Sequence, residues 1–189
     1  MNIEQVKEQA QAQGDHEHPP RIMPKVLILG HGRHGKDTVA ELMAERGLSF
    51  ASSSLYAAEK VVRPALAEVG ITYDSLEECY ADRVNHRAFW YDQISAFNGG
   101  GKSRLAELIL ENHDVYVGMR SQREYVASLP LFDYVVWVDA SKRGLPPEPR
   151  DSFDIDYDPL IMQLIDNNKD LKHLEREVDR FVERVMSRW

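Results

Sequence analysis

The stretch "KVLILGHGRHGKDTVAELM", residues 25–43, decides the fold of this 189-residue chain. A continuous apolar run at 25–29 is followed by a turn with three glycines and then by apolar side chains at helical spacing. An apolar strand without polar alternation is typical of a parallel sheet that is covered on both faces. The stretch therefore predicts a buried strand, a glycine-rich turn and a helix over 37–47 that ends at Gly47.

Short apolar runs alternate with longer segments of helical period in the rest of the chain. Further strands are expected at 48–52, 114–119 and 134–139, and helices at 55–70, 75–97, 102–113, 121–129 and 171–189. Pro64 should kink or divide the helix that contains it. Strands separated by helices require a parallel sheet with right-handed crossovers, so the sequence predicts an α/β three-layer sandwich with a mostly parallel sheet.

The composition is that of one globular domain. Hydrophobic residues make up 43% of the chain, and residues 1–24 are polar and end in a proline-rich sequence. We therefore expect a flexible tail over 1–24 and one folded domain over 25–189. The single Cys79 cannot form an internal disulfide, and no long apolar stretch suggests a membrane segment, which favours a reducing, cytoplasmic location. The net charge of −8 excludes a global attraction to nucleic acid.

The glycine-rich turn has the spacing of a phosphate-binding loop. Such a loop converges its N–H groups on a phosphate at a helix N-terminus, while a lysine reaches the outer phosphates. The pattern G-x-x-x-x-G-K is complete, but Asp37 stands where a Ser or Thr hydroxyl usually holds Mg²⁺. Either Asp37 or Thr38 could take that role. The predicted nucleotide-binding residues are Gly30, His31, Gly32, Arg33, His34, Gly35, Lys36, Asp37 and Thr38.

Two other interpretations of this turn compete with a triphosphate site. Gly30, Gly32 and Gly35 also fit the dinucleotide pattern G-x-G-x-x-G. Lys36 directly after the last glycine favours the triphosphate loop, and no acidic residue ends a second strand about twenty residues later. A purely structural turn, with Asp37 as the helix N-cap, is the third interpretation.

Charged residues at strand ends are candidates for the remaining chemistry. Asp139 ends the strand 134–139 and could hold a metal, whereas Gly118 stands where a metal-binding carboxylate could end the strand 114–119. Arg120 follows that second strand, and a guanidinium is suited to a phosphate. Arg143 opens a proline-rich loop that could close over a transferring phosphate and exclude water.

The segment 82–98 combines arginines with aromatic residues. In one continuous helix, Arg83, Arg87, Trp90 and Tyr91 would share a face on which arginines bind phosphate and aromatics stack on a base. The alternative is a helix that buries its aromatic residues and leaves its arginines in solvent. Candidates for a general base are Asp82 and Asp92.

Four stretches, "GHGRHGKDTVAELM", "HRAFWYDQI", "YVGMRSQREY" and "VVWVDASKRGLPPEP", resemble in that order the small phage-encoded P-loop kinases related to deoxynucleoside monophosphate kinases. More narrowly, they resemble the phage 5-hydroxymethyluracil DNA kinases. The resemblance spans about residues 25–150. It implies a nucleoside-monophosphate-kinase-like P-loop fold, ATP and Mg²⁺ as cofactors, and transfer of the γ-phosphate. Gly-Lys-Asp is similar to the motif of the monophosphate kinase branch.

The resemblance leaves the acceptor and the catalytic residues as expectations. Lys36 would bridge the β- and γ-phosphates, Asp139 with Asp37 or Thr38 would hold Mg²⁺, and a group of arginines would bind the acceptor or neutralise charge, namely Arg87, Arg120 and Arg143. The short chain favours a hydroxymethylated DNA base as acceptor, whereas the acidic charge favours a free deoxynucleoside monophosphate. A non-catalytic nucleotide-binding module is a third alternative, kept open by Gly118. A phage enzyme would act in the host cytoplasm.

Overall fold

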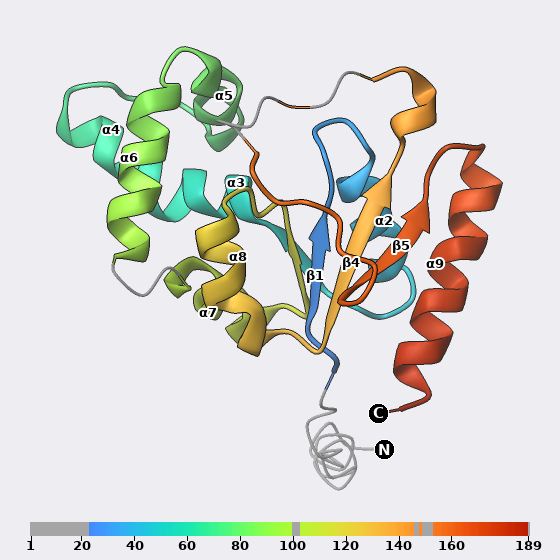
Figure 1. Cartoon of the computed structure of the whole chain (residues 1–189). Coiled ribbons are helices and arrows are strands. Elements are labelled where there is room, and N and C mark those ends of the chain that lie inside the picture. The colour runs from blue at the N-terminus through green and yellow to red at the C-terminus, as the bar shows by residue number, and fades with distance from the viewer. Residues whose placement is uncertain (1–22, 100–102, 146–147, 149–152, 189) are drawn as a thin grey trace, which may run out of the picture.

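The structure, a computed structural model, describes residues 23–99, 103–145, 148 and 153–188. Within these residues, parallel strands form one sheet in the order β2-β3-β1-β4-β5. The strands are β1 (Val26–Leu29), β2 (Phe50–Ser52), β3 (Val115–Val117), β4 (Tyr134–Asp139) and β5 (Met162–Asp166). Helices cover both faces of this sheet (Figure 1). The predicted α/β sandwich with a parallel sheet is confirmed.

The central strand β1 is fully buried, as its unbroken apolar sequence predicts. Val26 and Ile28 pack with α2 (Lys36–Ala44) and α9 (Leu171–Met186) on one face. Leu27 and Leu29 point to the other face, where α7 (Arg104–Asn112) and α8 (Gln122–Ser128) contribute to the core. Two apolar layers therefore hold β1 between β3 and β4, and the turn that follows β1 starts from a rigid strand.

The last strand, β5, was not expected from the sequence. It pairs with β4 at the edge of the sheet, from Val135 opposite Met162 to Asp139 opposite Asp166. One side chain of β5, Leu164, remains 44% exposed, and its neighbour Gln163 is half-buried. An edge strand that keeps contact with solvent lacks the unbroken apolar run of a central strand, so its sequence signal is weak.

The segment between β2 and β3 forms a cluster of short helices beside the sheet (Figure 1). It contains α3 (Ser53–Ala57), a π-helical turn (Ala58–Val62), α4 (Arg63–Glu68), α5 (Leu76–Ala81), a 3₁₀ turn (Asp82–Val84) and α6 (Arg87–Asn98). Pro64 lies in the first turn of α4, where its missing N–H costs no helical hydrogen bond. The backbone stays helical from α3 through the π-helical turn to α4, so Pro64 lies at a change of helix type, and the predicted division into two helices is not observed.

The end of α2 follows its sequence signal. The helix stops at Ala44, and Gly47 adopts a left-handed conformation with φ +95°. The N–H of Leu48 donates to the carbonyl of Met43, which closes the helix as a C-terminal glycine motif does. No described helix has the length and apolar character needed to cross a membrane. Of the predicted tail, residues 1–22 lie outside the described residues, and the domain limits stay a prediction.

Candidate functional site

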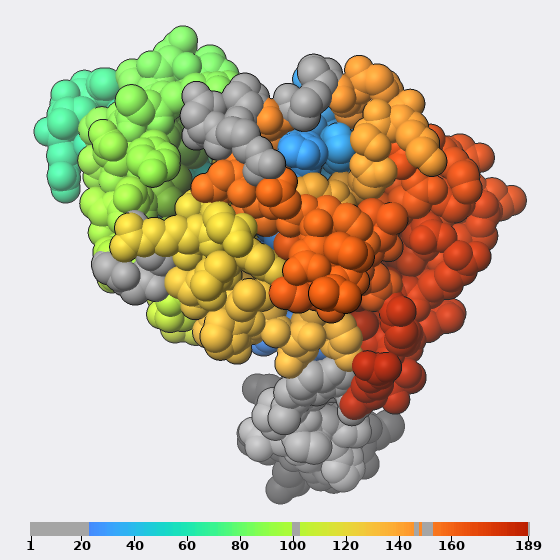
Figure 2. Space-filling view, in the orientation of Figure 1, coloured from blue at the N-terminus to red at the C-terminus, as the bar shows by residue number. Residues whose placement is uncertain are grey.

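The glycine-rich turn lies at the carboxyl end of β1, where ligands of open parallel sheets bind. It reaches the surface as blue atoms between the green helices and the orange segment after β4 (Figure 2). Two positions of the turn require glycine, because atoms of other segments lie where a Cβ would be. A Cβ at Gly30, whose φ is +138°, would lie 2.5 Å from the carbonyl oxygen of Val138. A Cβ at Gly35, whose φ is +89°, would collide with the side-chain nitrogen of Asn167.

Lys36 begins α2 and folds back across the turn. Its Nζ donates hydrogen bonds to the carbonyl oxygens of Gly30 and His31, both at 2.8 Å. The pKa of Lys36 is lowered to about 8, chiefly by burial and also by the charge of Arg120, against the opposing effects of Glu148 and Asp37. The ammonium group is therefore held over the turn at a site where an added negative charge would be favourable.

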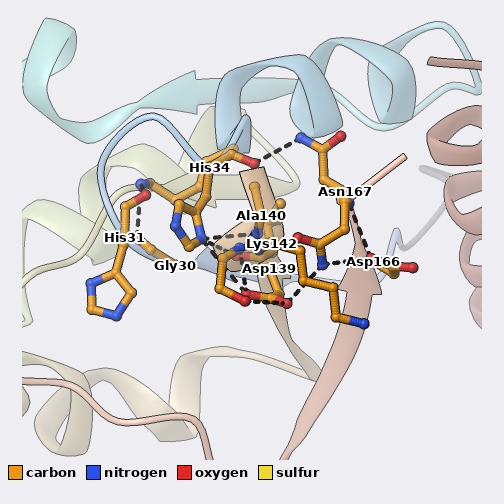
Figure 3. A network of polar contacts seen from close by, with 12 residues as sticks. Gly30, His31, His34, Asp139, Ala140, Lys142, Asp166 and Asn167 are labelled. Atoms are coloured by element: carbon orange, nitrogen blue, oxygen red, sulfur yellow. Dashed lines mark hydrogen bonds and ion pairs between the residues drawn. The ribbon is translucent and has the colours of Figure 1, made fainter. Parts of the chain in front are cut away.

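His34 joins the turn to the end of β4. Its buried ring accepts a hydrogen bond at Nδ1 from the backbone N–H of Ala140, at 3.1 Å. The same Nδ1 lies 3.3 Å from the carbonyl oxygen of Val138, so two backbone contacts hold the ring at the end of β4. The ring of His31 packs edge-on against Trp137 and Phe153. Both histidines of the motif thus have structural positions within the turn, and Figure 3 shows His34 directed at the β4 end.

Asn167, in the loop after β5, holds the turn from the other side. Its Nδ2 donates to the carbonyl of His34 at 2.8 Å (Figure 3). Its Oδ1 accepts from Arg143 at 3.0 Å. Arg143, predicted as a catalytic residue, therefore contacts the residue that braces the turn. Sequence reasoning missed Asn167 because the strand before it was not recognised. An Asn pair after an apolar run, Asn167 with Asn168, is the signal that could have indicated a loop there.

Asp139 ends β4 as predicted, but its carboxylate already has hydrogen-bond partners. It accepts from the N–H and hydroxyl of Ser141, at 3.0 and 3.1 Å, and from Nδ2 of Asn168 at 2.9 Å. Burial alone would raise the pKa of Asp139, but these hydrogen bonds lower it below its usual value. The carboxylate is therefore ionised and braces the ends of β4 and β5.

The predicted metal ligands do not form a complete metal site by themselves. Asp37 is exposed and Thr38 is half-buried in the first turn of α2. The described part of the chain contains no group of three or more His, Cys, Asp or Glu side chains that could hold a metal. Mg²⁺ at phosphate sites uses one or two carboxylates together with phosphate oxygens and water. Asp37, Thr38 and Asp139 therefore stay predictions.

Glu148 lies against the turn and was not predicted. Its carboxylate accepts a hydrogen bond from the backbone N–H of Gly32 at 2.5 Å and one from the guanidinium of Arg120 at 2.6 Å. Burial would raise the pKa of Glu148, but the hydrogen bond and charge of Arg120 lower it, with help from the Gly32 N–H and Lys36. An ionised carboxylate is thus seated where the turn, the end of β3 and Lys36 all favour negative charge.

The predicted common face of arginines and aromatics is wrong. The chain leaves the helical path at His86, between the 3₁₀ turn and α6. Arg83 lies in that 3₁₀ turn, with its guanidinium carbon 3.9 Å from the ring centre of Tyr80. Trp90 is buried among the short helices, whereas Tyr91 is 72% exposed. The helix therefore buries one of its aromatic residues rather than presenting both to a ligand.

Arg87 and the two candidate bases, Asp82 and Asp92, make no described contact with the glycine-rich turn. Arg87 is exposed at the start of α6, and no hydrogen bond or ion pair among the described residues joins it to the turn. Asp82 accepts from the hydroxyl of Tyr73 at 2.7 Å and lies 3.1 Å from Nε2 of His86. These contacts lower the pKa of Asp82, which makes it a poor proton acceptor. Asp92 is exposed on α6.

Comparison with known proteins finds distant structural similarity. No family model and no curated protein sequence matches the chain. A gluconokinase from Sinorhizobium meliloti 1021 is 12% identical, with a TM-score of 0.46 and coverage of 87% of this chain and 97% of that chain. A sugar kinase from Janibacter sp. HTCC2649 is 13% identical, with a TM-score of 0.44 and coverage of 86% and 94%. The Thermus thermophilus protein TT1252 is 15% identical, with a TM-score of 0.48 and coverage of 86% and 98%.

Proposed function

We propose that the chain is an ATP-dependent phosphotransferase that binds the nucleotide's phosphates at the turn 30–38. The observation that carries this proposal is the carboxylate of Glu148, seated on the Gly32 N–H and the Arg120 guanidinium. The ammonium of Lys36 lies on the same turn, bonded to its carbonyl oxygens. A backbone amide, a guanidinium and an ammonium that meet at the carboxyl ends of parallel strands form an anion site, and a polyphosphate is the anion that this arrangement suits.

The residues of the turn take the following roles in this proposal. The N–H groups of residues 32–36 bind the β-phosphate, and Lys36 bridges the β- and γ-phosphates. Arg120 neutralises the charge that develops on the transferred phosphoryl group, a role in which arginine is worth roughly 10³–10⁵ in rate. Arg143 supports the turn through Asn167. Arg87, exposed on α6, is assigned to the acceptor.

The residues near the turn fit a magnesium ion that arrives with the nucleotide. Asp37 is exposed at the N-terminus of α2, and its carboxylate makes no hydrogen bond with another residue that the structure describes. Its carboxylate, with the hydroxyl of Thr38, supplies the oxygen ligands that Mg²⁺ prefers. Asp139 would act from the end of β4 on the water shell of the metal. Bound Mg²⁺ would neutralise phosphate charge and offset the repulsion between Asp37 and the nucleotide.

The first candidate acceptor is the hydroxymethyl group of 5-hydroxymethyluracil in DNA, as the resemblance of the four sequence stretches implies. The hydroxyl oxygen attacks the γ-phosphorus, the bond to the β–γ bridging oxygen breaks, ADP leaves, and the hydroxyl proton passes to a base or to water. A base inside a duplex must be flipped out or single-stranded to reach the nucleotide. The product would be a phosphorylated base, activated for later substitution in thymidine hypermodification.

A free deoxynucleoside monophosphate is the second candidate acceptor. The net charge of −8 gives the protein no overall attraction for the DNA backbone, whereas a small anion needs only the local arginines. The acceptor in this case is the phosphate oxygen of the monophosphate, and the product is a diphosphate.

The proposal is tested by incubating the protein and Mg²⁺ with γ-labelled ATP and each acceptor in turn. The acceptors are 5-hydroxymethyluracil DNA, the same DNA with thymine, and a panel of deoxynucleoside monophosphates. We expect label only in the hydroxymethylated DNA, and no transfer by Lys36→Ala. The matched control is Lys172→Ala, which removes an exposed lysine of α9 and should transfer at the wild-type rate.

Other results distinguish the candidates. Label confined to the monophosphates assigns the second acceptor and rejects the first. Saturable ATP binding without transfer to any acceptor supports a nucleotide-binding module in place of an enzyme. Equal transfer by the wild-type protein and Lys36→Ala would contradict the assignment of the turn.

A further inference from the structure

We infer that Glu148 is an internal occupant of the phosphate site, so that nucleotide binds only by displacing its carboxylate. This inference rests on the proposed function of the turn and adds a form of self-regulation to it. It rests on the hydrogen bonds of Glu148 with Gly32 and Arg120 and on its charge interaction with Lys36.

The contacts of Glu148 are those of a bound anion. One carboxylate oxygen accepts from the backbone N–H of Gly32, and the other accepts from Arg120. These two donors belong to segments 88 residues apart in the chain, which the sheet brings together at the ends of β1 and β3. An oxyanion that bridges a loop amide and a guanidinium uses the same donors as a phosphate oxygen would.

The space at Gly32 matches this occupancy. A Cβ built on Gly32 would lie 3.1 Å from the carboxyl carbon of Glu148 and 3.1 Å from its Oε1, closer than ordinary van der Waals contact. The second glycine of the turn therefore leaves room for the carboxylate. The side chain of Glu148 is 21% exposed, whereas that of Arg120 is 55% exposed. The carboxylate is thus inserted toward the turn, and the arginine closes over it from the solvent side.

A phosphate and this carboxylate cannot share the site. Both are anions that require the Gly32 N–H, and like charges at hydrogen-bond separation repel strongly when partly buried. Lys36 is likewise arranged for the nucleotide-free protein, because its ammonium donates hydrogen bonds to the carbonyls of Gly30 and His31. Nucleotide binding therefore replaces the carboxylate of Glu148 with a phosphate, and the ammonium of Lys36 exchanges its carbonyl partners for phosphate oxygens.

The cost of displacement sets the expected size of the effect. One hydrogen bond of ordinary net strength and one partly exposed ion pair correspond together to roughly 5- to 50-fold in an equilibrium constant. When the binding-competent state is populated only in part, the apparent dissociation constant rises by the inverse of that fraction. Removal of the carboxylate should therefore tighten ATP binding by about 5- to 50-fold.

The test measures the dissociation constants of Mg²⁺·ATP and of inorganic tripolyphosphate by calorimetry for four full-length proteins. These are the wild type, Glu148→Gln, Glu148→Ala and the control Glu177→Gln. The control removes an equal charge from an ion pair with Arg180 on α9. Glu148→Gln keeps the shape of the side chain, and Glu148→Ala removes it. Thermal unfolding of each variant verifies that it is folded.

The inference predicts that both Glu148 variants bind ATP and tripolyphosphate about 5- to 50-fold more tightly than the wild type, while Glu177→Gln binds as the wild type does. Unchanged or weaker binding by both variants, with measurable binding by the wild type, overturns the inference and leaves the proposed function standing. Weaker binding would mean that Glu148 positions Arg120 for the nucleotide. Absence of binding in all four proteins rejects the proposed function, and with it the inference.

Discussion

The side-chain Nδ2 of Asn167 lies 2.8 Å from the carbonyl oxygen of His34, so a loop that follows the last strand braces the turn that follows the first. The contact is buried, and it fixes the backbone at the point where Gly35 adopts a φ of +89° and α2 begins. The shape of the turn is therefore determined by residues more than 130 positions away as well as by its own glycines. Three predictions below depend on this arrangement of strand ends.

The first prediction concerns Gly35→Ala. A left-handed backbone costs a residue with a Cβ roughly 1–2 kcal/mol, and the collision with Asn167 adds about 1–3 kcal/mol of overpacking. The matched control is Gly70→Ala, since Gly70 has a φ of +85° and no atom within 4 Å of an added Cβ. Urea unfolding should show a clearly larger loss for Gly35→Ala. Equal losses in both variants would mean that Asn167 moves aside freely.

Asn167→Ala should weaken both the fold and the site. The substitution leaves the buried carbonyl of His34 without this donor and removes a partner of Arg143, which costs about 1–3 kcal/mol of unfolding free energy. Because the turn then loses its brace, ATP affinity should also fall. Asn112→Ala, at an exposed position that ends α7, is the control and should change neither quantity. Calorimetric ATP titration and thermal unfolding measure the two effects, and unaltered affinity would show that the turn needs no support from this loop.

A third prediction concerns Asn168, which lies between two carboxylates. Its Nδ2 donates to Asp139 at 2.9 Å and to Asp166 at 2.7 Å, and these bonds help to lower the pKa of both acids. Asn168→Asp places a third negative charge there, which raises the folded-state pKa of the group above its unfolded value. The variant should therefore be destabilised by about 1–3 kcal/mol at pH 7, and the deficit should shrink as the pH falls toward 5.

The wild type should respond to pH in the opposite sense. A lowered carboxylate pKa contributes stability that is present above the unfolded value and is lost as the pH falls through the folded value. Asp139 and Asp166 both have lowered pKa values, so the wild type should lose stability below about pH 4. Urea unfolding at pH 7, pH 5 and pH 3 compares the two proteins. A deficit in Asn168→Asp that stays constant with pH would indicate a lost hydrogen bond without charge repulsion.

The parts of the fold that follow local patterns were predictable from the sequence. An unbroken apolar run gave β1, the glycine spacing gave the turn, and Gly47 gave the end of α2, because each depends on residues close together in the chain. The edge strand β5 was missed because three of its five side chains keep solvent contact. A periodic pattern of apolar residues appears only where a strand or helix buries one regular face, and this edge strand buries its side chains irregularly.

The residues that complete the candidate site could not be predicted from local sequence patterns. Glu148 contacts Gly32 across 116 positions of sequence, and Asn167 contacts His34 across 133. Contacts of that kind are set by the order of strands in the sheet, which the sequence pattern did not specify. The error at 82–98 has a local cause instead. A 3₁₀ turn before α6 rotates Arg83 away from Arg87, and a spacing rule assumes an unbroken helix.

The last prediction concerns the pH dependence of ATP binding. Burial holds the pKa of Lys36 at about 8, and a bound polyphosphate should raise it by stabilising the ammonium. ATP binding should therefore change little near pH 7, where the ATP phosphates and the lysine are both charged, and should weaken up to about tenfold per pH unit above 8. Binding at pH 8.5 should take up a proton, which calorimetry in two buffers of different ionisation enthalpy detects.

Deprotonation of Lys36 does not destabilise the fold, so unfolding caused by this group cannot explain the loss of ATP affinity above pH 8. Between pH 8 and 10.5, the ordinary pKa of a lysine, the folded protein releases the lysine proton while the unfolded chain retains it, so this group makes the fold more stable as the pH rises. Lys36→Arg is the control, because a guanidinium stays charged throughout the range. If that variant binds ATP, its affinity should not change between pH 7.5 and 9.5. A pH-independent affinity in the wild type would show that the Lys36 ammonium does not contact the phosphates.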